Sequence, residues 1–131
     1  MNQLTKTNKL DLIPLGLRSF ASARVGIPPY KNLSDRDKTS SCYDLITKVH
    51  ASHGHQGNDP KVLAFQTQEL KDCLKDKYGE LTIPEIQTAF EMLIAGEFGA
   101  YMGLYKKSYY QALKGYYEKP QRAESMKQYL A

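Results

Sequence analysis

The strongest constraint in this sequence is a pair of amphipathic segments joined by glycines, between Thr82 and Tyr117. Thr82 and Glu85 have the spacing of a capping box, in which each side chain accepts a hydrogen bond from the other residue's backbone N–H. Apolar residues then recur every three or four positions, as on one face of a helix; they are Ile86, Ala89, Phe90, Leu93 and Ile94. Gly96 ends the pattern, so we expect a helix between Thr82 and Gly96.

A second helix is predicted beyond a glycine-containing connection. Gly96, Gly99 and Gly103 leave little room for a regular element between them. After Gly103 the helical period returns, with a predicted core face of Tyr105, Tyr109, Ala112, Leu113 and Tyr116. Pro120 bends the chain into a last short helix over 121–130. This is the layout of helix-turn-helix proteins, which offer the second helix to a partner, and ordinary helical hairpins use the same parts.

Two earlier helices complete the predicted fold. The first begins around Asp35–Ser40, and its buried stripe comprises Cys42, Leu45, Ile46 and Val49. The other begins at Asp59-Pro60, an N-cap followed by a proline in the first turn, and ends at Gly79. Its apolar arc comprises Val62, Leu63, Leu70, Cys73, Leu74 and Tyr78. Because the links are short, we expect an all-α fold: a compact bundle of four to five helices forming one helical domain over residues 35–131.

Residues 1–34 have a different character from the rest of the chain. They are too apolar for a free tail, yet their prolines and glycines exclude a long helix. We expect an extended N-terminal arm. Two alternatives remain open: the arm docks across the helical body, or its basic residues reach along nucleic acid.

The sequence offers few residues for catalysis. It lacks phosphate-binding, hydrolase, zinc-protease and dinucleotide-binding motifs, so we expect no enzymatic activity and no cofactor. His50, His53 and His55 invite a metal-site hypothesis, but no fourth ligand has a recognisable spacing, and a solvated loop is the simpler interpretation. Cys42 and Cys73 fall on apolar faces and are expected to be packed free thiols, although a bridge between them is not excluded. No apolar run is long enough for a membrane span and no secretory signal is evident, so the expected location is cytoplasmic.

Charge and tyrosine are concentrated toward the C-terminus. Residues 81–105 contain three glutamates and no Lys or Arg, whereas residues 106–131 contain six Lys or Arg and two glutamates. Seven of the ten tyrosines lie from Tyr101 onward. Lysine neutralises phosphate and tyrosine offers a ring for stacking, so this end of the chain is a candidate for contact with DNA or with another protein.

The residues expected to contact a partner lie on the second helix and just beyond it. Lys107 and Lys114 are placed opposite the core face, with Tyr110 and Tyr117 on its flank. The complete set of predicted partner-binding residues is Lys106, Lys107, Tyr110, Lys114, Tyr117, Lys119 and Arg122.

Between Val62 and Ala123 the chain resembles small helical proteins of bacterial prophages and mobile elements. The residues that carry the resemblance are Tyr78, Leu81-Thr82-x-x-Glu85-Ile86, Ala89-Phe90, Gly96-Glu97-Phe98-Gly99-x-Tyr101, Gly103-Leu104 and Leu113-x-x-Tyr116. The resemblance implies a role in phage replication, beside a replicative helicase as loaders act. It transfers no catalytic residue. Where comparable proteins place a tryptophan directly before the leucine that corresponds to Leu113, this chain has Ala112.

The leading hypothesis is therefore a non-enzymatic phage or mobile-element protein that acts in DNA metabolism by binding nucleic acid, a replication protein, or both. The alternative is a protein-interaction adaptor or inhibitor that makes no contact with nucleic acid. The third hypothesis, a small metal-dependent enzyme, requires metal bound by the three histidines. No membrane partner is expected under the leading hypothesis.

Overall fold

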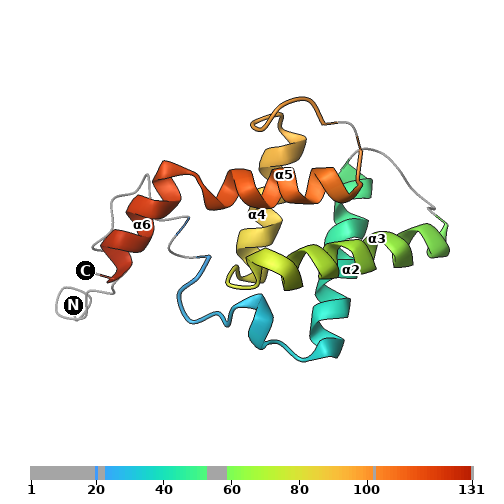
Figure 1. Ribbon diagram of the computed structural model, residues 1–131, viewed down its shortest axis with the longest axis horizontal. Coiled ribbons are helices and arrows are strands. Elements are labelled where there is room, and N and C mark those ends of the chain that lie inside the picture. Colours follow the sequence, from blue (N-terminus) through green and yellow to red (C-terminus); the bar gives the residue numbers. More distant parts are fainter. Residues whose placement is uncertain (1–19, 21–22, 53–58, 102, 131) are drawn as a thin grey trace, which may run out of the picture.

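The computed structural model describes residues 20, 23–52, 59–101 and 103–130, and the fold is all-α (Figure 1). Its elements are η3 (Tyr30–Asn32), α2 (Asp35–Ser52), α3 (Pro60–Cys73), η4 (Leu74–Tyr78), α4 (Ile83–Ile94), α5 (Lys106–Tyr117) and α6 (Pro120–Leu130). The described ranges contain no β-strand, only one isolated bridge between Glu97 and Gly99. The prediction of a helical bundle is confirmed.

The helices form two crossed layers. In Figure 1, α3 and α5 run across the front of the molecule, and α2 and α4 cross behind them. The layers are joined where α2 packs on α3 and α4 packs on α5, while α3 and α5 also contact each other. Helix α6 extends from the end of α5 at one side of the molecule (Figure 1). Helix α5 is therefore held from behind by α4 and along one side by α3.

The core lies between these layers and contains most of the residues that the helical periods predict, although Val62 of the predicted arc on α3 is 45% exposed. All four residues of the predicted stripe on α2 are buried, and so are Ile86, Ala89, Phe90 and Leu93 of α4. On α5 the buried apolar residues are Tyr109, Ala112, Leu113 and Tyr116. Both cysteines are buried free thiols, as expected.

Helix α4 begins as its sequence predicts. The Thr82 Oγ1 accepts from the Glu85 N–H at 3.3 Å, and the Glu85 Oε1 accepts from the Thr82 N–H at 3.1 Å. These two bonds are the capping box. Gly96 has a φ of +85°, a conformation that other residues rarely adopt, and it ends the helix.

The helix predicted to end at Gly79 does continue to Tyr78, but its last turn is π-helical. Helix α3 ends at Cys73, and the next five residues form the π-helical turn η4. A π-helix makes its hydrogen bonds across five residues and has a wider turn than an α-helix. Leu74 and Tyr78 are nevertheless buried, as the predicted apolar arc requires.

Residues 23–34 pack against the helical body, so docking is the alternative that holds for this part of the arm. The Tyr30 N–H donates to the Leu81 carbonyl at 2.8 Å, and the Lys31 N–H donates to the Gly79 carbonyl at 2.9 Å. The Tyr30 side chain is buried in the core. Residues 1–19 and 21–22 of the predicted arm lie outside the described residues, and the domain boundary at residue 34 stays a prediction.

Candidate functional site

Helix α5 has one buried side and one side turned to solvent. Its buried side is pressed against α4 and α3. On the opposite side Lys106, Lys107 and Lys114 are exposed, and Tyr117 is 44% exposed. We call these four residues the α5 lysine face. None of its three lysine side chains has a hydrogen bond or ion pair with a described residue.

The beginning of α5 lacks the features that usually stabilise a helix start. Its N-cap residue is Tyr105, which has no side-chain oxygen in reach of the first turn, and no side-chain cap is formed. The first turn contains no acidic residue and begins with Lys106 and Lys107. The backbone N–H groups of these two lysines have no acceptor among the described residues. The helix start therefore combines open N–H donors with two ammonium groups.

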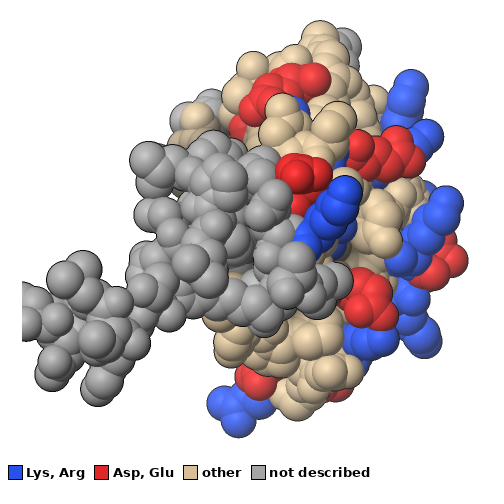
Figure 2. All heavy atoms as spheres, turned by 90° about the vertical axis from the view of Figure 1, so that its left-hand side faces the viewer, with Lys and Arg blue, Asp and Glu red and all other residues tan. Residues whose placement is uncertain are grey.

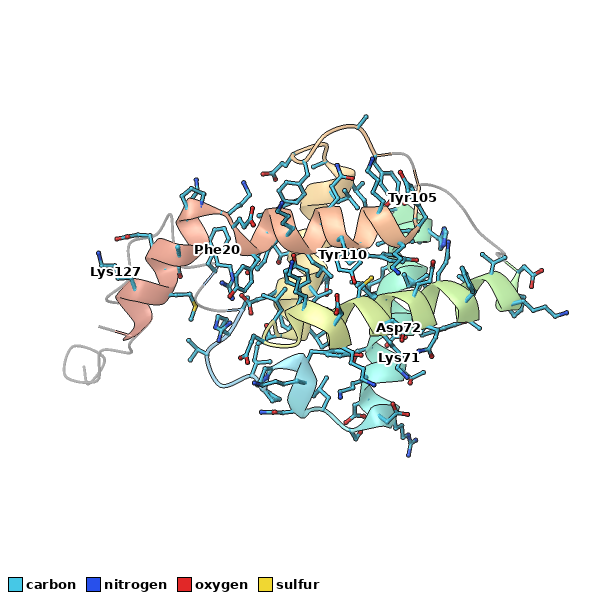
Figure 3. All side chains as sticks on the ribbon, viewed as in Figure 1. Phe20, Lys71, Asp72, Tyr105, Tyr110 and Lys127 are labelled. Atoms are coloured by element: carbon cyan, nitrogen blue, oxygen red, sulfur yellow. The ribbon has the colours of Figure 1, made fainter. Side chains whose placement is uncertain are left out.

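Tyr105 itself was wrongly predicted to lie on the core face. It is 44% exposed, because its extended backbone (φ −156°, ψ 173°) takes it out of the helical period. Figure 3 shows Tyr105 at the start of α5, at the end of the helix away from α6. The core face begins one turn later, at Tyr109.

Tyr110 lies between α5 and the end of α3 and is only partly exposed (Figure 3). Its hydroxyl donates to the Asp76 Oδ2 at 2.9 Å, and its ring centroid lies 6.3 Å from that of Tyr78. The hydrogen bond to the Asp76 carboxylate, together with burial, raises the pKa of Tyr110. This tyrosine joins α5 to η4, and its hydroxyl is already engaged within the protein.

Tyr117 is the more accessible of the two predicted flanking tyrosines. Its ring lies 5.9 Å from the Tyr78 ring, and the Arg122 guanidinium carbon lies 4.6 Å from its centroid. At that distance the guanidinium is within the range of a cation–π interaction. The remaining exposed part of the Tyr117 ring faces solvent at the C-terminal end of the lysine face.

Arg122 was predicted to support a partner contact, and the structure places it inside the fold. Only 8% of it is exposed. Its Nε donates to the Glu85 Oε2 at 3.0 Å. The helix α6 carries Arg122 back toward α4, and its partner lies 37 residues earlier in the chain. A local sequence pattern does not reveal such a contact.

Lys119 is likewise committed within the protein. Its Nζ lies 3.0 Å from the Glu97 Oε1 and 5.9 Å from the Phe98 ring centroid. It thus ties the beginning of α6 to the glycine-containing connection. Of the seven predicted residues, the structure gathers Lys106, Lys107, Lys114 and Tyr117 on one exposed side, leaves Tyr110 at its edge, and turns Lys119 and Arg122 to internal partners.

Glu85 is a central residue that the sequence did not identify beyond its capping role. It is completely buried, and its carboxylate accepts from Arg24 Nη1 at 3.1 Å, Arg122 Nε at 3.0 Å and Tyr116 Oη at 3.1 Å. It therefore links the N-terminal segment, α4, α5 and α6. Burial and the neighbouring Glu85 carboxylate raise the pKa of Tyr116, which keeps its hydroxyl protonated as a donor.

The metal-site hypothesis gains no support from the described residues. The His50 Nε2 lies 2.7 Å from the Gln66 Oε1, whereas His53 and His55 lie outside the described residues. No group of three or more potential ligands is assembled within the part of the chain that the structure describes. Burial raises the pKa of the Cys42 thiol to about 11, which disfavours the thiolate that a metal or an electrophile would need.

Comparison with known proteins identifies no relative. No protein-family model matches the sequence, and no curated protein or solved structure is similar enough to count as a match. The resemblance to prophage proteins therefore stays a prediction. Among the described helices, none has the length and apolar character needed to cross a membrane.

Proposed function

We propose that this protein is non-enzymatic and acts in DNA metabolism by binding nucleic acid through the α5 lysine face. The observation that carries the proposal is the beginning of α5, which has two lysines, no acid and no side-chain cap. A phage or mobile-element origin and a cytoplasmic location belong to the same proposal and rest on the sequence.

The helix dipole explains why this arrangement favours an anion. The N-terminus of a helix carries a partial positive charge, so each lysine in the first turn is disfavoured by about 0.3–1 kcal/mol in the isolated protein. A phosphate at the same place is attracted by the dipole, by the open N–H groups and by the two ammonium groups. Lys106 and Lys107 are therefore unfavourable for the free protein and favourable for a complex with phosphate.

The length of the face suits a nucleic-acid backbone. Lys107 and Lys114 are separated by seven residues, which corresponds to about 10 Å along a helix. That distance is about the axial rise of three nucleotides in one strand. Figure 2, which views the molecule from its α6 end, shows Lys and Arg interspersed with Asp and Glu on that side.

The face is suited to contacts with phosphates and not to reading bases. Direct readout requires side chains such as Asn, Gln or Arg that form two hydrogen bonds with a base edge. Gln111 is the only such residue on α5, and its amide donates to the Phe98 carbonyl. We therefore expect binding that depends strongly on salt and weakly on sequence.

The test is the affinity of the protein for a fluorescent oligonucleotide, measured by anisotropy between about 50 mM and about 200 mM salt. Lys107→Glu combined with Lys114→Glu should reduce the slope of log K against log salt by about two, since each lost phosphate contact contributes about 0.9. The matched control is Lys48→Glu with Lys61→Glu, which makes the same charge change at two exposed helical lysines away from α5.

The outcomes distinguish DNA binding at the α5 lysine face from general electrostatic attraction between DNA and a basic protein. Weaker binding and a lower slope in the α5 variant alone support the proposal. Equal losses in both double variants contradict a localised site, and wild-type protein that does not bind at low salt rules out the nucleic-acid function.

A second candidate function is contact with another protein, such as a replication protein, without nucleic acid. The observation that favours it is a pair of exposed apolar side chains on the first two turns of α3, where Val62 is 45% exposed and Phe65 is 65% exposed. Residues three apart share one side of a helix. Sedimentation should show self-association or a complex that Val62→Ser with Phe65→Ser abolishes; a strictly monomeric protein counts against this function.

A further inference from the structure

A groove of about 450 Å³ lies on the side of the molecule where the docked N-terminal segment meets the end of α3. Four elements and the turn after η4 contribute to it. It is lined by Tyr30, Lys31, Asp35, Lys38, Gln68, Lys71, Asp72, Leu74, Lys75, Asp76, Lys77, Gly79 and Glu80. Figure 3 shows two of these residues, Lys71 and Asp72, on the side of α3 that is turned toward η3 and the beginning of α2. The volume is within the range of sites that bind small molecules.

The walls of the groove are fixed by the fold. Tyr30 and Leu74 are buried at its base, with exposed fractions of 2% and 0%. The backbone bonds from Tyr30 and Lys31 to the turn after η4 hold the two sides together. At Gly79 an added Cβ would lie 3.1 Å from the Lys31 Cβ, so the chains approach as closely as a residue without a side chain allows. The groove is therefore formed before any ligand arrives.

The π-helical turn η4 contributes three charged residues to the groove. Lys75, Asp76 and Lys77 are consecutive, and all three line the groove. Single π turns occur frequently at functional sites.

The carboxylates in the groove all have partners. Asp35 lies 3.4 Å from the Lys71 Nζ, and Glu80 pairs with Lys31. Asp72 accepts from the Gln68 amide at 2.9 Å, and the hydroxyl of Tyr110 donates to Asp76. Asp72 and Asp76 are therefore bonded to neutral groups only, and the five lysines of the lining exceed its four carboxylates by one charge.

Three of the five lysines have no carboxylate partner. Lys38 places its ammonium 5.4 Å from the Tyr30 ring centroid, and Lys75 and Lys77 have no ion pair or side-chain hydrogen bond with a described residue. Lys31 and Lys71 are the two that are paired. The groove thus has three ammonium groups without an ion pair and a lining with one net positive charge, which favours an anion such as a phosphate group.

We propose that this groove binds a small phosphorylated molecule, of about the size of a nucleotide, through Lys38, Lys75 and Lys77. The site is separate from the α5 lysine face and does not depend on the function proposed for that face. The shared chemistry of the two sites is phosphate, so the experiment must distinguish a free phosphorylated molecule from the backbone of a nucleic acid.

The experiment follows backbone amide signals of the full chain by NMR during titration with inorganic pyrophosphate, with ADP and with a short oligonucleotide. Pyrophosphate and ADP should shift the signals of Lys75 to Gly79 and of Lys38 in a saturable manner. Lys75→Gln combined with Lys77→Gln should weaken both by about tenfold or more, because two charge-assisted contacts are lost. Lys48→Gln combined with Lys61→Gln, which removes the same charge from exposed helical positions, should leave both affinities unchanged.

Every outcome bears on the proposal. Saturable shifts that only the Lys75/Lys77 variant loses support it. It is overturned if pyrophosphate and ADP leave the groove signals unchanged, if the control variant loses as much affinity, or if only the oligonucleotide shifts these signals. Thermal unfolding of both double variants checks that the exposed substitutions preserve the fold. Loss of DNA binding on Lys107→Glu with Lys114→Glu is measured separately, so each proposal fails or stands by itself.

Discussion

The starts of α4 and α5 differ in how their backbone N–H groups are capped and in the charge of their first turns. At α4 the capping box is complete, and Glu85 is fully buried while it also accepts from two arginines and a tyrosine. At α5 the cap residue is an exposed tyrosine without a cap bond, and the first turn contains two lysines. One helix start is satisfied by partners within the chain, and the other is left with unused donors.

The difference between the two helix starts indicates that the α4 start stabilises the fold, whereas the α5 start is suited to binding an anion. Proteins usually follow local rules of capping and charge placement, and departures from these rules are concentrated at functional sites. The α4 start follows the rules and joins four parts of the chain. The α5 start departs from them on the surface, where an external anion can supply what is missing. The comparison predicts large losses of stability from changes near Glu85 and a gain from correcting α5.

The largest expected effect comes from Glu85→Ala. The change leaves Arg24 and Arg122 without their shared carboxylate and Tyr116 without its acceptor. Removal of one partner from a buried ion pair typically costs about 3–5 kcal/mol. Urea unfolding should show a loss of this size in the free energy of unfolding.

Glu91→Ala is the matched control, since Glu91 is an exposed glutamate on the same helix. An exposed substitution of this kind should change the free energy of unfolding by less than about 0.5 kcal/mol. If the two variants were equally stable, Glu85 would not have the central role that its contacts indicate.

The second-largest expected effect is a loss of stability at alkaline pH, which arises from the buried Cys42 thiol. Burial raises the pKa of Cys42 from 9.0 to about 11. The folded state therefore keeps a proton that the unfolded state loses, and the stabilisation from this group is complete below pH 9 and disappears as pH rises through about 11. Two pKa units correspond to about 2–3 kcal/mol. Urea unfolding at a series of pH values should show the loss, and Cys42→Ala should reduce its size between pH 9 and 11; an unchanged profile would contradict it.

A smaller loss is expected from Thr82→Ala. The variant removes the hydroxyl that accepts from Glu85 N–H and that also donates to the Ala23 carbonyl. Loss of a threonine cap costs about 1 kcal/mol, within a range of about 0.5–2. Thr88→Ala, on the same helix, removes a hydroxyl that only bonds back to the Pro84 carbonyl and should cost less. Thermal unfolding of the two variants compares their losses of stability. Equal losses would show that the cap bond at Thr82 stabilises the protein no more than the bond from Thr88.

The parts of the fold that local patterns control could be predicted from the sequence. The capping box at Thr82 and Glu85 involves residues three apart, and Gly96 follows the last apolar position of the same helix. The faces of α2, α4 and most of α5 follow from the helical period. Lys107 and Lys114 were placed on the exposed side by the same argument.

The sequence-based predictions fail where contacts between distant residues or unusual backbone geometry determine the position of a side chain. Arg122 is buried because α6 returns toward Glu85, and nothing near Arg122 in the sequence indicates that path. Tyr105 leaves the core face because it is the cap residue and not part of the helix. The π turn η4 ends a helix for which the sequence predicts a regular period up to Gly79. The groove joins residues of η3, α2, α3 and η4 that lie far apart in the sequence, so sequence spacing does not reveal it.

The most direct attempt to break the comparison is to give α5 the cap that α4 has. Tyr105 already has the extended backbone of an N-cap residue, so Tyr105→Ser supplies a hydroxyl to the open N–H groups without a change of conformation. The expected gain in the free energy of unfolding is about 0.5–1 kcal/mol, less any loss of contacts from the tyrosine ring. Tyr43→Ser is the matched control, since Tyr43 is also 44% exposed but lies within α2, where a serine cannot act as a cap. If the open helix start binds phosphate, Tyr105→Ser should also weaken binding of an oligonucleotide, because the new hydroxyl competes for the same N–H donors. Gain of stability together with loss of binding would mean that the missing cap serves binding; gain of stability with unchanged binding would restrict the nucleic-acid contact to the lysine side chains.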